Sequence, residues 1–192
     1  MRIGRIDRLT WTLAALFLLL LTLPAAALAA DQGSEHYTAT AVGIRGPVGG
    51  QSFPVNIYIS GETSDAELQE LSNLYAEKGK IALRDRLSDI EKGRMGRADR
   101  VGVDVALVRR TQTDEGQKII LVAVRDQTFF EIRSASRSTE YPYVWVELTV
   151  DDEGRGSGEI IFPAQIRFSD DGQLEVKEFG LEFFRLANVR LR

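Results

Sequence analysis

Hydrophobic and polar residues alternate with a two-residue period in several parts of the chain, and this pattern predicts β-strands. In the segment 53–60, Val55, Ile57 and Ile59 share one face of an extended backbone. The segment 37–44 alternates more loosely and predicts a strand that precedes it. We therefore expect two strands at the start of the globular part of the chain.

A helical spacing replaces this alternation over residues 64–91. Ser64 and Glu67 have the Ser-x-x-Glu spacing of a capping box, in which each side chain bonds the free backbone N–H of the other residue. Glycine accepts the left-handed conformation that ends helices, so Gly79 predicts a break. The apolar positions on both sides of it recur at helical intervals: Leu68, Leu71, Leu74, Tyr75, Leu83, Leu87 and Ile90. The pattern predicts a helical pair, or one kinked helix, whose leucine stripe faces the core.

The second half of the chain returns to strand periodicity. From 144 to 150, valine and leucine at even positions point one way and the residues between them point the other. In the predicted strand 118–125, residues 119–124 are apolar on both faces, which is typical of a central strand. Pro163 has no backbone N–H and predicts a sheet edge or a β-bulge. Together the segments predict an α+β fold. It has one antiparallel sheet of about seven to nine strands, strongly curved or partly closed like a barrel, and a helical pair inserted after the second strand.

The first thirty residues have a different pattern, which is typical of an export signal. Three arginines precede an apolar run, and a cluster of alanines that ends at Ala30 follows it. A charged start, an apolar centre and a small-residue end define a secretory signal peptide. We predict cleavage near Ala29, which makes 1–29 the signal and 30–192 a single β-rich globular domain in the periplasm or outside the cell. The alternative is an uncleaved membrane anchor, because the segment from Leu9 to Ala30 is long enough to span a bilayer at roughly 20 residues per crossing.

The charge of the processed chain bears on its partners. Removing residues 1–29 takes away three arginines and one aspartate, which leaves 21 basic and 27 acidic side chains and a net charge of −6. Proteins that bind nucleic acid carry a basic surface, so nucleic acid is not an expected partner. We expect contact with a membrane only through the signal segment, if it stays uncleaved.

The absence of cysteine removes several kinds of chemistry. With no cysteine, the chain has no disulfide, no thiolate nucleophile and no cysteine ligand for zinc. Its single histidine, His36, lies near the predicted new N-terminus, which is a poor place for a catalytic imidazole. We therefore expect no metal, no cofactor and no catalytic residue of these classes.

A group of aromatic and arginine side chains in the second half is the candidate binding site. It consists of Arg125, Phe129, Arg133, Tyr141, Tyr143 and Trp145. Rings with an apolar body and a polar tip, placed beside arginines, suit an amphipathic small molecule or a protein partner. In the other interpretation, the helical pair covers this face of the sheet and the rings belong to a second layer of the core.

Two functions of different class follow from these observations. The favoured one is an exported, non-catalytic binding module for an amphipathic ligand or a protein partner. The alternative is a cell-envelope hydrolase with paired carboxylates, because such pairs meet in space rather than in sequence. Its most plausible members lie on or beside predicted strands: Asp126, Glu131, Glu147 and Glu159.

Overall fold

The structure is a computed structural model that describes residues 33–45, 49–125, 140–169, 172–178 and 183–192. All of them belong to one compact unit, residues 32–192. The predicted signal segment lies outside the described residues.

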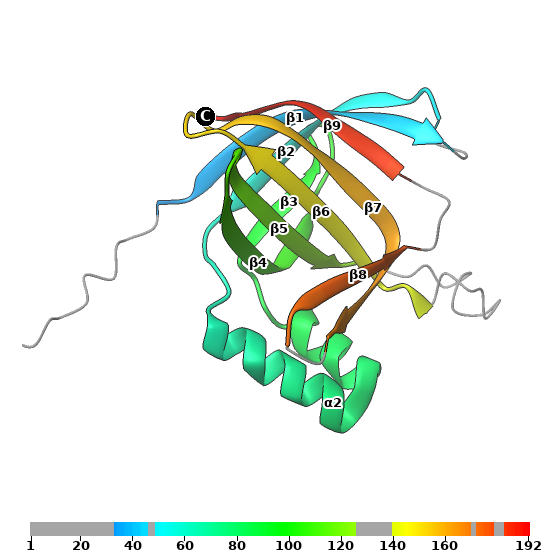
Figure 1. The fold of residues 1–192 in the computed structure, drawn as a ribbon. Helices are drawn as coiled ribbons and strands as arrows, with labels where there is room; N and C mark the ends of the chain where they lie inside the picture. Colours follow the sequence, from blue (N-terminus) through cyan, green and yellow to red (C-terminus); the bar gives the residue numbers. More distant parts are fainter. Residues whose placement is uncertain (1–32, 46–48, 126–139, 170–171, 179–182) are drawn as a thin grey trace, which may run out of the picture. The chain divides into compact units, whose positions relative to one another are not determined.

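Nine strands and one helix make up the described part of the chain. In chain order they are β1 (Glu35–Arg45), β2 (Ser52–Ile59), α2 (Asp65–Ser88), β3 (Gly93–Arg97), β4 (Val103–Thr113), β5 (Gly116–Val124), β6 (Tyr143–Val150), β7 (Arg155–Phe168), β8 (Leu174–Glu178) and β9 (Phe183–Leu191). Neighbouring strands run in the order β6-β5-β4-β3-β2-β1-β9-β7-β8, and β6 also pairs with β7. Eight strands therefore close into an antiparallel barrel, and β8 extends from its wall (Figure 1).

This architecture corrects the predicted fold class. The prediction of an α+β sheet with an inserted helical pair is wrong, because the sheet closes on itself and a single helical element lies outside it. Closure depends on β9, which pairs with β1 from Tyr37 opposite Leu191 and with β7 from Arg155 opposite Arg190. These partners are far apart in the sequence, so local periodicity carries no sign of them.

Hydrophobic side chains fill the barrel. The interior cluster takes residues from strands all round the ring, including Ala41, Ile57, Val105, Leu121, Leu148 and Leu186. Their inward direction follows from the alternation of side chains along each strand. The barrel interior is consequently a packed core, and a ligand site has to be sought at its ends or on its outer wall.

A second cluster lies outside the barrel, between α2 and the wall. From the helix it takes Leu68, Leu71, Leu83 and Leu87, and from the wall Ala106, Leu107, Val122, Tyr143, Trp145, Ile161, Ala164 and Ile166. In Figure 1 the helix lies below the barrel, beside β8. This cluster gives the wall of β4 to β7 apolar residues on both faces, which explains the apolar run at 119–124.

The helix α2 contains one break. Gly79 has φ 78° and ψ −174°, a conformation outside the helical region that marks a kink between two helical segments. Figure 1 shows that α2 changes direction along its length. Because only glycine adopts such angles at little cost, this residue sets the angle between the two halves of α2. No helix among the described residues is both long enough and apolar enough to cross a membrane.

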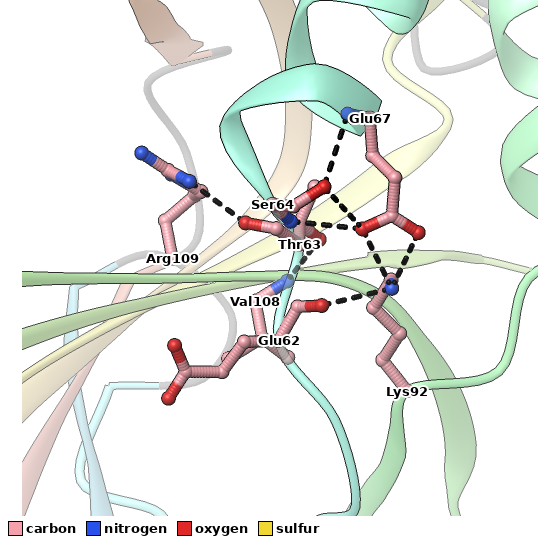
Figure 2. A network of polar contacts seen from close by, with 7 residues as sticks. All are labelled: Glu62, Thr63, Ser64, Glu67, Lys92, Val108 and Arg109. Carbon is pink, nitrogen blue, oxygen red and sulfur yellow. Dashed lines mark hydrogen bonds and ion pairs between the residues drawn. The ribbon is translucent and has the colours of Figure 1, made fainter. Parts of the chain in front are cut away.

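Polar contacts attach the first turn of α2 to the barrel (Figure 2). Ser64 is the N-cap, and both halves of the predicted capping box with Glu67 are present. The Lys92 Nζ donates to Glu67 Oε1 at 2.9 Å and to the backbone oxygen of Glu62 at 2.9 Å. These bonds tie the start of the helix to the segment that leads into β3.

The residue before the cap is bonded to β4 on the barrel wall. The backbone N–H of Thr63 donates to the Val108 oxygen at 2.8 Å, and the Val108 N–H donates to Thr63 Oγ1 at 3.1 Å. Arg109 Nη1 donates to the Thr63 oxygen at 2.7 Å. The start of α2 is therefore held in one place, which fixes the position of the helix over the outer wall.

Candidate functional site

Of the six predicted binding residues, Tyr143 and Trp145 lie beneath α2. Their side chains point outward from β6 into the second cluster, where they are 1% and 3% exposed. They form part of a second layer of core and offer no open aromatic surface. The hydrophobic pattern was compatible with a second core layer as well as with a binding face, and the position of α2 makes these two rings part of the core.

Arg125 and Tyr141, two more of the predicted residues, lie just outside the ends of β5 and β6. Arg125 follows β5, and its Nε donates to the Tyr141 backbone oxygen at 3.1 Å. Its backbone N–H donates to the Pro142 oxygen at 2.9 Å, so this arginine joins the segment after β5 to the segment before β6. Phe129 and Arg133 lie outside the described residues.

A cavity opens beside Tyr143, between the second half of α2 and the wall of the barrel. It has a volume of about 220 Å³. We call it the helix cavity. Its lining consists of Lys80, Ile81, Arg84, Glu140, Pro142, Tyr143 and Gln165. The Gln165 Nε2 donates to the Glu140 backbone oxygen at 3.1 Å and so fixes one side of it. Tyr143 is the one predicted binding residue that lines the cavity.

Two of the side chains that line the helix cavity have buried polar atoms without a partner. The hydroxyl of Tyr143 and the Nε of Arg84 make no hydrogen bond, and neither does the nearby Nε1 of Trp145 in the same cluster. Buried polar atoms in proteins are nearly always bonded, and an unbonded one costs about 1–3 kcal/mol. Unbonded donors at a cavity are satisfied by whatever occupies it, whether water or a ligand.

The protonation of Tyr143 limits what it can offer a ligand. Burial raises the pKa of its phenol far above the usual value, and the charge of Arg84 opposes this only in part. The phenol stays neutral at physiological pH and can donate its O–H. The Nε of Arg84 is also a donor, and it has no acceptor role. The deep end of the helix cavity thus presents hydrogen-bond donors.

A second cavity, of about 480 Å³, lies at one end of the barrel. We call it the barrel-mouth cavity, and its lining includes Glu35, Tyr37, Glu62, Arg110, Gln112, Gln117, Val150, Asp151, Asp152 and Leu191. Gly33 and Gly154 complete it. Arg110 comes from β4 and is only 14% exposed at its side chain.

Every side of the Arg110 guanidinium faces a partner. Nη2 donates to Glu35 Oε2 at 2.8 Å, and Nη1 donates to Gln117 Oε1 at 2.7 Å. Nε lies 2.5 Å from Glu62 Oε1, an ion pair without the alignment of a hydrogen bond. Tyr37 bonds to the same group. The Nε of Arg110, like that of Arg84, is buried without a hydrogen bond, but it lies beside a carboxylate, so an incoming anion would have to compete with Glu62.

Two groups at the barrel mouth, Arg110 and Tyr37, have pKa values above the usual ones. Burial lowers the pKa of Arg110, but hydrogen bonds to Glu35 and Tyr37 outweigh it and the net direction is upward. Burial raises the pKa of Tyr37, although the hydrogen bond from Arg110 opposes the rise. The guanidinium therefore stays charged and the phenol stays neutral at physiological pH.

The structure brings together two of the four candidate hydrolase carboxylates. Glu147 on β6 and Glu159 on β7 are direct partners in the antiparallel register. They lie on the outer wall, and Glu147 is paired with Lys118 at 2.7 Å. Neither lines the helix cavity or the barrel-mouth cavity. Asp126 and Glu131 lie outside the described residues.

The sequence offered little sign of Arg84 and Gln165. Arg84 follows Leu83 on the helix, so it lies at the margin of the buried stripe, but a charged residue there is ordinarily solvated.

The described part of the chain also contains no group of three or more His, Cys, Asp or Glu residues arranged to hold a metal ion.

The fold and the site together define a closed eight-stranded antiparallel barrel with a packed interior and a small cavity beneath an external helix. Comparisons with protein-family models, with curated proteins and with solved structures find no match to this chain. The function therefore has to be argued from the site alone.

Proposed function

We propose that this chain is an exported, non-catalytic binding protein that holds a small amphipathic molecule in the helix cavity. The observation that carries the proposal is the pair of buried, unbonded polar atoms on Tyr143 and Arg84 at the same cavity. Apolar contact comes from Ile81 and Pro142 on the same lining. A ligand with an apolar body and one polar end matches this combination.

Export is the second part of the proposal, and it rests on the sequence of the first thirty residues. A positive start, an apolar centre and alanines at the end are the three parts that a secretory signal needs. We propose that the mature chain starts near Ala30 and works in the periplasm or outside the cell.

Paired-carboxylate hydrolysis has weaker support. Glu147 and Glu159 face each other across two strands, but they stand on the outer wall and Lys118 already neutralises one of them. An acid–base pair needs a pocket that holds the substrate between its carboxyl groups. We therefore propose binding and no hydrolysis.

Native mass spectrometry of the protein, purified gently from its own host, tests both parts. A chain that starts near residue 30 supports export, and a chain that retains residues 1–29 overturns cleavage. An added small mass supports binding if it is lost in the Ile81→Glu variant, in which a carboxylate replaces an apolar side chain of the cavity lining. Val101→Glu is the matched control, because Val101 is also an exposed apolar residue, 89% against 73%, and lies outside the cavity.

The outcomes separate the candidate occupants. An added mass that survives in Ile81→Glu and in Val101→Glu alike would place the ligand elsewhere and overturn the assignment of the cavity. An added polypeptide would favour a protein partner over a small molecule. A bare chain, together with no response to the probes described below, would overturn the binding function.

A further inference from the structure

We infer that the ligand of the helix cavity is a small organic anion, a carboxylate on a short apolar chain, with its head group between Arg84 and Tyr143. This inference rests on the proposed binding function and adds the chemical class of the ligand. It follows from three features of the cavity: the kind of polar atoms that lack partners, the charge of the lining, and the volume.

The unbonded atoms all come from hydrogen-bond donors. Arg84 Nε and Trp145 Nε1 only donate, and the buried Tyr143 phenol is a neutral O–H. A ligand that supplies acceptors satisfies such atoms, whereas an ammonium ion would add donors to donors. A carboxylate has two oxygens with room for about four bonds in total, and charged acceptors make the strongest bonds to guanidinium and hydroxyl groups.

The charge of the lining favours the same class. Arg84 and Lys80 are positive and Glu140 is negative, which leaves a net charge of +1 on the lining. Asp85 also acts on Tyr143, but it is exposed, as is Glu140, whereas Arg84 is half-buried. Within the described part of the chain, no carboxylate forms an ion pair with Arg84. An anionic head group would neutralise a cation that is removed in part from water.

The volume limits the size of the ligand. At about 30 Å³ for each water-sized group, 220 Å³ holds roughly seven non-hydrogen atoms. Tyr143 is 1% exposed and lies at the deep end, and Ile81 is 73% exposed and lies at the rim. A carboxylate at the deep end therefore leaves a short alkyl chain to run past Pro142 towards Ile81.

The experiment compares three probes of six carbons each that differ in the polar group at carbon 1: hexanoate, 1-hexanol and hexylammonium. Trp145 reports binding through its fluorescence, because it adjoins Tyr143 in the same cluster. For this assay Trp11 is replaced by Phe, which leaves Trp145 as the only tryptophan whether or not residues 1–29 are removed. We expect saturable binding of hexanoate, at least tenfold tighter than 1-hexanol, and no saturation with hexylammonium.

Three variants locate the head group. Tyr143→Phe removes one donor and should weaken hexanoate about tenfold, with little effect on 1-hexanol relative to the parent protein. Arg84→Met removes the charge and should abolish the preference for the anion, while Arg84→Lys should restore part of it. Tyr37→Phe in the barrel mouth is the matched control, because it makes the same chemical change at a buried tyrosine outside the helix cavity.

Failure of the inference is distinct from failure of the proposed function. Equal binding of 1-hexanol and hexanoate, or an unchanged preference in Arg84→Met, would overturn the anionic ligand and leave a binding cavity. Tighter binding of hexylammonium would do the same and would point to Glu140. No saturable response to any of the three probes, combined with a bare chain from the host, would overturn the binding function itself.

Discussion

The Tyr143→Phe variant tests the central observation without any ligand. The hydroxyl of Tyr143 is buried and has no partner, so the folded, ligand-free protein carries the cost of removing it from water. That cost is about 1–3 kcal/mol for a neutral group, and phenylalanine does not incur it. We expect the free energy of unfolding to rise by about 1 kcal/mol, and the midpoint of thermal unfolding to rise by about 2–4 °C for a domain of this size.

Tyr37→Phe makes the same substitution at a buried tyrosine whose hydroxyl is bonded, and the two changes in the free energy of unfolding should have opposite signs. Tyr37 is 3% exposed against 1% for Tyr143, but its hydroxyl bonds with Arg110 and Glu35. Bonds to charged groups are worth about 1.5–3 kcal/mol, so this variant should lose about 2 kcal/mol. Urea unfolding followed by far-ultraviolet circular dichroism measures both. A loss of similar size in the two variants would show that the Tyr143 hydroxyl has a partner, such as ordered water, and would remove the basis of the site.

Three further predictions concern the parts that hold the fold. Arg110→Met should lower the free energy of unfolding by about 2 kcal/mol in urea, because it leaves the Glu35 carboxylate without the guanidinium; an unchanged value would contradict the role of Arg110 at the barrel end. The hydrogen bond from Lys92 lowers the pKa of Glu67, so the stability it adds is present above the usual value of about 4.3 and is lost as pH falls through the lowered pKa. Glu67→Gln should therefore be less stable than the parent at pH 7, by under about 1 kcal/mol because Glu67 is 47% exposed. The two proteins should be equally stable near pH 2, and a difference in the free energy of unfolding that persists in acid would refute this origin. Gly79→Ala should cost about 1–3 kcal/mol by thermal unfolding, because no atom lies within 4 Å of the added Cβ and only the positive φ is strained; a neutral result would mean that the break in α2 tolerates other angles.

Local features of the fold were predictable because each depends on neighbouring residues. The alternation over 144–150 places Val146 and Leu148 in the barrel interior and Trp145 in the outer cluster. The Ser64 capping box is present as its spacing predicts. Pro163 lies between Ile161 and Ala164, where the register of β7 against β6 shifts. A residue in such a bulge does not have to donate a backbone N–H to the neighbouring strand, and proline has none to donate.

Closure and the site were not predictable, because they depend on residues far apart in the sequence. The pairing of β1 with β9 joins the two ends of the described chain, and without it the strands predict an open sheet as readily as a barrel. The helix cavity joins Arg84 on α2 to Tyr143 on β6. Periodicity shows that Tyr143 faces away from the interior, but it does not show that α2 covers this part of the wall.

The packed interior explains why the site lies beneath the helix. A barrel of eight strands leaves an interior just wide enough for side chains or for one small ligand, and here apolar side chains occupy it. The outer wall acquires a cavity only where a second element covers it, and α2 is that element. Its anchored first turn and the break at Gly79 set how closely its second half approaches Tyr143. The same geometry buries donors that have no hydrogen-bond partner in the protein, so we expect a bound acceptor to restore stability at this place.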